Sequence, residues 1–150
     1  MALETTFVMI KPDAVVRGLV GQIVARFEAK GLKIKAMRLE QADPKVVEKH
    51  YEVHKARPFY KGLVEYILSG PVVPMMVEGE SAIAVCRALM GATNPVQGKP
   101  GEIRFDFSQH IGRNIIHGSD SAETAAFELS LWFPKGGAEY RTASDPFLYE

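Results

Sequence analysis

The pattern of apolar and polar positions predicts strands and helices in alternation. Residues 6–10 form a compact β-rich run stopped by Pro12, and their dense apolar content indicates a strand buried on both faces. Apolar residues then recur at steps of three and four over residues 20–27, which predicts an amphipathic helix closed by Gly31. Basic and apolar residues alternate over residues 32–39, and this period of two predicts a strand with one face in water.

Helical spacing returns in the middle of the chain. A helix that begins at Pro44 would end before Pro58, and further helices are predicted over residues 59–68 and 81–90. Residues 72–77 form another apolar run. Because proline lacks a backbone N–H, Pro74 predicts that this strand lies at an edge or in an irregular position.

The last third of the chain begins with an aperiodic segment. No period holds over residues 92–113, where Gly and Pro recur, so we expect a long loop, and such loops are often functional. A short apolar strand over residues 114–117 and a helix over about residues 121–132 follow. Asp120 with Glu123 matches the pattern of a capping box. Helices interleaved with a few strands predict an α/β sandwich with helices against a sheet, but the pattern leaves the strand order open.

Composition narrows the class of protein. The 150 residues, 47% of them apolar, fit one folded domain over residues 1–150 and exclude a disordered chain. Equal numbers of basic and acidic residues, 18 of each, argue against a generally basic nucleic-acid binder or a polybasic membrane protein. No apolar run approaches the roughly 20 residues that span a bilayer. We see no signal peptide, and a single Cys86 forms no internal disulfide, so we expect a cytoplasmic protein.

The richest candidate for chemistry is His117, at the end of a predicted strand and just before a helix. The adjacent Gly118 adds no side-chain bulk, and the unpaired N–H groups of a helix start favour an arriving phosphate. A histidine that attacks phosphorus forms a covalent intermediate and divides one transfer into two. Ser119 and Glu128 are candidates to orient the ring. A histidine after a strand is more often a packing or capping residue, so the chemical interpretation requires phosphate-binding groups nearby.

Several cationic side chains are candidates for these phosphate-binding groups. Arg87, Arg104 and Arg113 occur in or beside the helix and long loop that precede the candidate histidine. The planar guanidinium donates two hydrogen bonds to a phosphate at once, although solvated surface charges are the alternative explanation. Lys11 follows the first buried strand, and Thr93 offers a hydroxyl. Because neither glycine-rich phosphate motif is present, a nucleotide site here must use side chains.

Two other histidines are spaced like ligands on a helix. His50 and His54 are four residues apart and could share one helix face. The sequence shows no third metal ligand beside them. We therefore predict no metal site from this pair.

Taken together, the motifs resemble those of nucleoside diphosphate kinases over almost the whole chain. The similar stretches, in this order, are residues 7–13, 17–21, 57–59, 69–73, 91–95 and 114–121. The resemblance implies an α/β (α+β sandwich) fold with a ferredoxin-like βαββαβ core, a four-stranded antiparallel sheet and added helices. It also implies transfer of the terminal phosphate of a nucleoside triphosphate to a nucleoside diphosphate.

The resemblance further implies which residues act on the phosphate. His117 matches the phosphorylated histidine, with Glu128 and Ser119 as the pair that positions it. The donor product leaves before the acceptor enters, so ping-pong kinetics are expected. Which imidazole nitrogen takes the phosphate remains open at this point. The residues that match the phosphate-binding set are Arg87, Thr93 and Arg104, with His54 near the phosphates in some relatives.

The remaining matches concern the nucleoside. Lys11 and Asn114 match the residues that hold the sugar hydroxyls, and Tyr51 matches a tyrosine that supports this lysine. Phe59 matches the aromatic ring on which the base stacks, with Ile111 facing the base from the other side. Stacking uses the face of any base without reading its edges, so broad base specificity is expected.

The same resemblance implies the cofactor and the assembly. Mg²⁺ is expected to bind mainly through the nucleotide phosphates, without a dedicated protein metal site. The family forms hexamers or tetramers, and the tail over residues 147–150 together with Pro95 favours a homo-hexamer. A binding module for nucleic acid or protein, or a purely structural domain, would leave the complete motif set unexplained. Nucleic acid is not expected as the main ligand, nor is a membrane.

Overall fold

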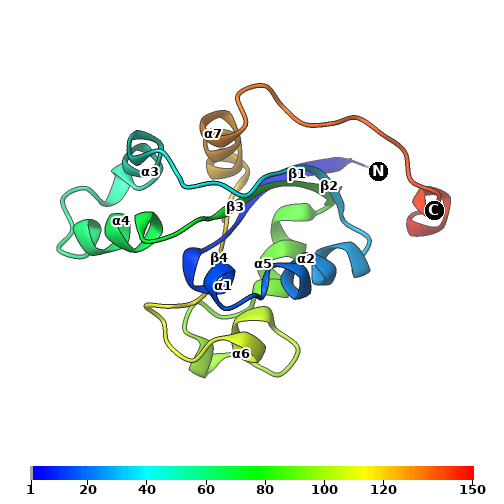
Figure 1. Cartoon of the computed structure of the whole chain (residues 1–150). Helices are drawn as coiled ribbons and strands as arrows, with labels where there is room; N and C mark the ends of the chain where they lie inside the picture. Colours follow the sequence, from blue (N-terminus) through cyan, green and yellow to red (C-terminus); the bar gives the residue numbers. More distant parts are fainter. Residues whose placement is uncertain (1) are drawn as a thin grey trace.

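The computed structural model describes residues 2–150 and places an antiparallel sheet between two layers of helices (Figure 1). The strand order is β2-β3-β1-β4, with every neighbouring pair antiparallel. This order and the sequence of elements confirm the predicted ferredoxin-like sheet. The strands are β1 (Leu3–Ile10), β2 (Lys33–Met37), β3 (Val73–Glu80) and β4 (Ile116–Gly118).

Strand β1 contributes side chains to both faces of the sheet. Phe7 and Met9 face one hydrophobic cluster, whereas Val8 and Ile10 face the other, and all four side chains are fully buried. This confirms a strand buried on both faces. Such a strand needs apolar residues at consecutive positions, because successive side chains point to opposite sides.

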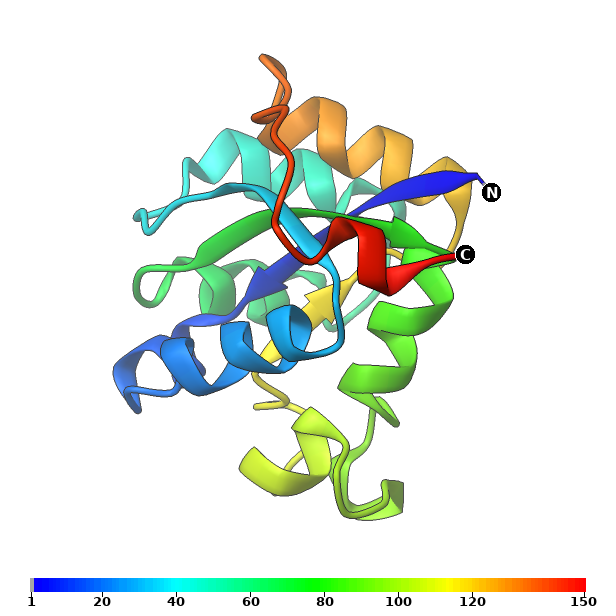
Figure 2. The same ribbon diagram turned by 90° about the vertical axis from the view of Figure 1, so that its right-hand side faces the viewer.

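Different helices cover the two faces, as the turned view shows (Figure 2). One face carries α2 (Val20–Ala29) and α5 (Ala82–Met90), which bury Phe27 and Met90. The other face carries α3 (Pro44–His50), α4 (Tyr60–Leu68) and α7 (Ala122–Trp132), which bury Val47, Ile67 and Trp132. The short elements are α1 (Pro12–Val16), η1 (Glu52–His54), η2 (Pro95–Gln97), α6 (Ile103–Phe107) and α8 (Asp145–Leu148).

Two predictions in the last third of the chain need correction. The segment over residues 92–113 is not all loop, because it contains η2 and α6. The capping box of α7 consists of Ser121 and Thr124 rather than Asp120 and Glu123. The N-cap is one residue later than predicted, and the Ser121 hydroxyl accepts the N–H of Thr124 at 3.1 Å.

Because of Pro74, strand β3 was expected at an edge or in an irregular position; it lies between β1 and β2, and its pairing with β2 is irregular. Pro74 pairs with Met9 of β1, while the continuous ladder to β2 ends at the pair of Met37 and Met75. The residue without an N–H therefore stands just beyond this ladder. Arg38 stands opposite Pro74 and donates its N–H to the Pro74 carbonyl at 3.3 Å, so the strand keeps one bond to its neighbour although proline cannot donate the other.

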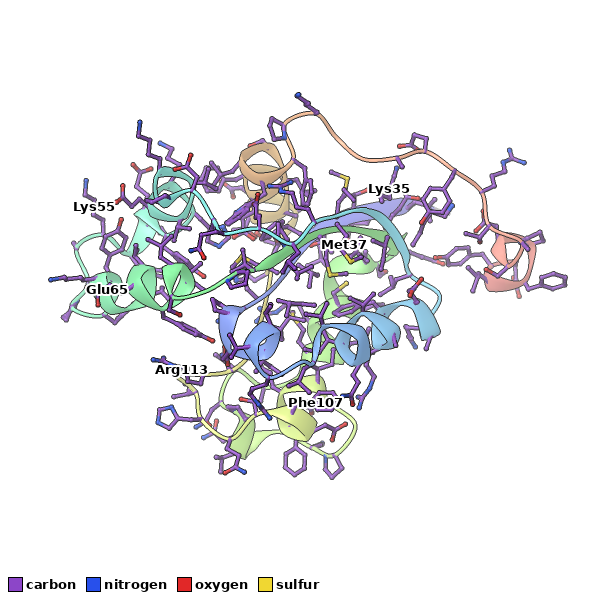
Figure 3. The ribbon with its side chains drawn as sticks, in the orientation of Figure 1. Lys35, Met37, Lys55, Glu65, Phe107 and Arg113 are labelled. Carbon is purple, nitrogen blue, oxygen red and sulfur yellow. The ribbon has the colours of Figure 1, made fainter. Side chains whose placement is uncertain are left out.

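Strand β2 also departs from its predicted pattern. Its alternation predicted that Lys35 would face water, yet Lys35 is only 8% exposed. A register shift between Ile34 and Ala36 interrupts the alternation, and the C-terminal tail crosses the strand, where the Ala138 N–H donates to the Lys35 carbonyl at 2.7 Å. The ammonium of Lys35, a residue labelled in Figure 3, forms ion pairs with the carboxylates of Glu78 and Glu139.

No helix within residues 2–150 is both long and apolar enough to cross a lipid bilayer.

Candidate active site

His117 stands in the middle of β4, opposite Met9 of β1. The strand begins two residues later than predicted because Ile115 has a φ of +66°, which is rare for a β-branched residue. Strained backbone of this kind clusters at functional sites. The Ile115 carbonyl accepts the N–H of Lys11 at 2.8 Å, so this turn joins the histidine strand to the end of β1.

A buried carboxylate holds one nitrogen of the candidate histidine. His117 Nε2 lies 2.8 Å from Glu128 Oε1, and the Ser119 hydroxyl donates to the same oxygen at 2.6 Å. Burial alone would raise the pKa of Glu128, but the hydrogen bond from His117 and the nearby imidazoles outweigh it and lower that pKa. An ionised carboxylate only accepts hydrogen bonds, so Nε2 carries the ring proton.

This geometry assigns distinct tasks to the two orienting groups. Ser119 reaches His117 only through Glu128, since its hydroxyl donates to the carboxylate. With the proton on Nε2, the lone pair of His117 lies on Nδ1. The half-buried ring, with 21% of its side chain exposed, thus carries an unprotonated nitrogen, the form that a nucleophilic histidine requires.

Sequence reasoning missed a third member of this cluster, His50 at the end of α3. Its Nε2 lies 3.6 Å from Glu128 Oε2, and its ring centroid is 4.7 Å from that of His117. His50 does not pair with His54, because α3 ends at His50 and the chain turns into η1. No local signal links His50 to Glu128, since the tertiary fold alone brings α3 beside α7.

Lys11 and Asn114 meet at the ends of β1 and the loop before β4. The Lys11 ammonium donates to Asn114 Oδ1 at 2.8 Å, and the Asn114 amide donates to the Thr93 carbonyl at 3.1 Å. Burial and then the charge of Arg104 lower the pKa of Lys11 to about 8. The three predicted residues are therefore joined in one hydrogen-bonded chain.

Two predicted arginines are tied to the backbone on either side of His117. Arg87 donates to the Gly118 carbonyl at 3.1 Å, and Arg104 donates to the Ile116 carbonyl at 2.7 Å. Arg104 is 3% exposed, and burial, followed by the charge of Arg87, lowers its pKa to about 10, which leaves it cationic at neutral pH. Positive charge is thus concentrated beside the histidine strand.

An aromatic groove of about 600 Å³ lies next to these residues, lined in part by Phe59, Tyr66 and Arg113. The Arg113 guanidinium lies 4.4 Å from the centre of the Tyr66 ring, and Lys11 Nζ lies 5.7 Å from the same centre. Tyr66 therefore connects the groove with Lys11. Phe59 is 53% exposed, so its ring is available for stacking.

The remaining predicted residues surround this groove and the cluster. His54 lies 5.3 Å from Phe59 between ring centroids, Ile111 is exposed, and Thr93 is exposed. The Tyr51 hydroxyl is buried, and within residues 2–150 it has no hydrogen-bond partner. The ring over Lys11 is that of Tyr66, so support of the lysine by Tyr51 stays a prediction.

The site and the fold together define a class of protein. A ferredoxin-like sheet presents a histidine with one carboxylate-bound nitrogen, among lysine and arginine side chains suited to phosphate. This is the class of an enzyme that handles phosphate groups.

Comparison with known proteins gives the family. The family model of nucleoside diphosphate kinase matches residues 4–137. Nucleoside diphosphate kinase 1 of Zea mays is 51% identical over 148 residues, and nucleoside diphosphate kinase B of Flaveria bidentis is 52% identical over 148 residues. The matches cover 99% of this chain in both cases, and 99% and 100% of the respective relatives.

Solved structures agree with this assignment. The nucleoside diphosphate kinase of Halobacterium salinarum in complex with CDP superposes with a TM-score of 0.95 at 41% identity, covering 99% of this chain and 100% of that one. A family protein from Babesia bovis gives a TM-score of 0.94 at 45% identity, with coverages of 97% and 99%. The chain belongs to the nucleoside diphosphate kinase family. It is therefore a phosphotransferase that moves phosphate between nucleoside triphosphates and diphosphates.

Proposed function

We propose that the transfer runs in two halves through a phosphohistidine at His117 Nδ1. In the first half, Nδ1 attacks the terminal phosphorus of the donor while the bond to its bridging oxygen breaks and the diphosphate leaves. In the second half, a terminal oxygen of the acceptor diphosphate attacks the phosphohistidine and frees Nδ1. The observation that carries this proposal is the 2.8 Å contact between His117 Nε2 and Glu128 Oε1, which keeps the other nitrogen unprotonated.

Charge stabilisation follows from the surrounding groups. As Nδ1 bonds to phosphorus the ring becomes positive, and the adjacent carboxylate of Glu128 stabilises that charge. Arg87, Arg104 and Lys11 neutralise the moving phosphoryl group and the diphosphate that leaves. Each guanidinium carries five N–H donors, so an arginine bound to a backbone carbonyl still has donors for phosphate. Thr93 and His54 complete the proposed phosphate-binding set.

The proposed nucleoside site extends from Lys11 into the aromatic groove. The base stacks on Phe59 and faces Ile111 on its other side, while Lys11 and Asn114 bind the sugar hydroxyls. The hydrogen-bonded chain of Lys11, Asn114 and Thr93 supports this placement, because it orders polar groups between the groove and the histidine. Broad base specificity follows, since stacking does not read base edges. Tyr51 remains a proposed positioning group for Lys11.

Mg²⁺ is proposed to enter with the nucleotide, held by phosphate oxygens. His50, His117 and Glu128 are the one group in the described part of the chain that could bind a metal ion directly. This group offers two ring nitrogens and a single carboxylate, which suits zinc or copper better than Mg²⁺. When bound, Mg²⁺ would neutralise phosphate charge, and the cationic side chains named above would hold the same phosphates.

The proposed working form is a cytoplasmic homo-hexamer of one-domain chains. Six copies of the 16.6 kDa chain have a mass of about 100 kDa, which light scattering distinguishes from a tetramer.

The experiment for the phosphohistidine uses ATP labelled on its terminal phosphate, with Mg²⁺ and without acceptor. We expect acid-labile, base-stable label on the chain, and its complete transfer to added GDP. His117→Ala abolishes labelling, whereas His110→Ala, at an exposed histidine, leaves it intact. Absence of label on folded wild-type protein would refute the proposal.

A further inference from the structure

His50 is a buried titratable side chain to which the proposed transfer assigns no task. It is 5% exposed, closes α3, and lies against both His117 and Glu128. Its Nε2 makes no hydrogen bond in the part of the chain that the structure describes. Burying a polar nitrogen in this way costs free energy, so such a group calls for an explanation.

The protonation state of His50 follows from its other neighbour. The Trp132 indole N–H donates to His50 Nδ1 at 3.0 Å, and an indole can only donate. His50 Nδ1 is therefore the acceptor, and the proton of the neutral ring lies on Nε2. The Nε2 nitrogen lies 3.6 Å from Glu128 Oε2, beyond hydrogen-bond length but close enough for the N–H dipole to attract the carboxylate.

The ring is also held in its neutral form. Burial, followed by the charge of a protonated His117, lowers the pKa of His50 to about 3, against the opposing effect of Glu128. Lys11 lowers it further. A protonated His50 would compete with His117 for the single carboxylate, and this environment prevents that competition. The full negative charge of Glu128 thus remains for the His117 ring.

We propose that His50 is a positioning residue for the transfer, acting through Glu128. Its Nε2–H attracts Oε2 and thereby fixes the rotation of the carboxylate, so that Oε1 stays on His117 Nε2 and Ser119. The nearly perpendicular contact between the two imidazoles, with an interplanar angle of 74°, restricts the tilt of the His117 ring. Trp132 contributes indirectly, because its N–H selects the His50 tautomer that carries the proton on Nε2. The catalytic consequence rests on the proposed phosphohistidine function, whereas the tautomer itself does not.

Two variants distinguish the roles of the two ring nitrogens of His50. His50→Asn places a carbonyl near Nδ1, so it keeps an acceptor for Trp132 and loses the donor towards Glu128. His50→Gln places an amide N–H near Nε2, so it keeps the donor and loses the acceptor. If His50 served only to accept the hydrogen bond of the buried Trp132 indole, Asn would be the better substitute. If His50 positions Glu128, as proposed, Gln is the better substitute.

The first readout is the single-turnover rate of His117 phosphorylation by ATP, with nucleotide affinity measured separately. We expect His50→Asn to slow labelling about 10- to 100-fold at unchanged ATP affinity, as for other small misplacements of a reacting group. His50→Gln should stay within about threefold of wild type, since it preserves the positioning contact. Equal rates for His50→Asn and wild type, or a greater loss in His50→Gln, would overturn the proposal.

The second readout is the ¹⁵N NMR spectrum of the His117 ring without nucleotide. Wild type and His50→Gln should show a protonated Nε2 and a bare Nδ1, and His50→Asn should show a mixture of tautomers. An unchanged spectrum in His50→Asn counts against the proposal. This measurement stays decisive even if wild-type protein takes no label, a result that would defeat only the phosphohistidine mechanism. His50→Phe keeps the ring without either nitrogen and replaces His50→Asn if that variant unfolds.

Discussion

The contact between Glu128 and His117 can be tested by removing its charge while keeping its shape. Glu128→Gln retains an oxygen that can accept the proton of His117 Nε2, and the side chain occupies almost the same volume. Both Ser119 and His117 bind the same carboxylate oxygen, at 2.6 Å and 2.8 Å. The substitution therefore converts two charge-assisted hydrogen bonds into neutral ones at a position where the side chain is only 9% exposed.

The magnitude follows from the strength of such bonds. A hydrogen bond to a charged group contributes about 1.5–3 kcal/mol, against about 0.5–1.5 kcal/mol for a neutral one. The difference, about 1–2 kcal/mol, applies most fully when the His117 ring becomes positive, because the carboxylate then faces a charge. It corresponds to a roughly 5- to 30-fold slower phosphorylation step. Because the pKa of Glu128 is lowered in the fold, the carboxylate is charged throughout the neutral range, so the loss should not vary there.

The assay is rapid-quench labelling with terminally labelled ATP in excess over enzyme, at several pH values in the neutral range. Glu123→Gln is the matched control, because Glu123 lies exposed in the first turn of the same helix. Ser119→Ala should slow the step less, and the double variant should fall short of the product of the single effects, since Ser119 acts through Glu128. A rate for Glu128→Gln within about twofold of wild type would refute the positioning argument.

Three further predictions follow from other parts of the site. Phe59→Ala should weaken binding of ADP, GDP and CDP alike, by about 5- to 150-fold in calorimetry, because stacking contributes about 1–3 kcal/mol whatever the base. Since the pKa of Lys11 is lowered to about 8, its positive charge is present below that pH and lost above it. Nucleotide affinity should therefore fall as the pH rises through about 8, and Lys11→Gln should abolish this dependence of affinity on pH. Gly91→Ala should destabilise the fold by about 1–3 kcal/mol in denaturant unfolding, because Gly91 has a φ of +81° and an added Cβ would lie 1.9 Å from Glu102 Oε2. By contrast, Gly62→Ala in α4 should stabilise the fold by about 0.5–1 kcal/mol.

Each of these expectations has a result that contradicts it. A base-selective loss in Phe59→Ala would mean that base edges are read. An affinity independent of pH between 7 and about 9 would mean that the charge of Lys11 is not used in binding. Equal stability of Gly91→Ala and Gly62→Ala would mean that the loop after α5 relaxes freely around Glu102.

The elements with the strongest periodicity were predicted well. Residues 6–10 lie in β1, and the helix ended by Gly31 is α2, because these segments bury whole faces and their apolar spacing reports it directly. Two of the errors fall where the tertiary structure overrides the local pattern. Lys35 is buried because the tail and Glu78 cover it, and Pro74 occupies an interior strand because the ladder to β2 ends beside it.

For the candidate active site, the identities of the residues could be predicted from the sequence, but their orientations could not. The motif around His117 pointed to phosphate chemistry, and Lys11, Asn114, Arg87 and Arg104 do gather beside it in the structure. The orientation of these groups could not be foreseen, since it depends on backbone carbonyls that only the fold brings close. His50 was passed over because its partners, Glu128 and Trp132, lie on a helix near the other end of the chain.

By itself, then, the sequence determined which segments bury apolar faces and which reactive side chains the chain carries, because both properties belong to residues and their local spacing. It also determined the family, through motifs spread along most of the chain. Tertiary structure alone decided which ring nitrogen of His117 contacts Glu128, which tautomer His50 adopts, and which cationic side chains, such as Lys11, are buried away from water. Protonation and charge depend on distance and burial, and both are set by segments that meet only when the sheet and its two helical layers are assembled.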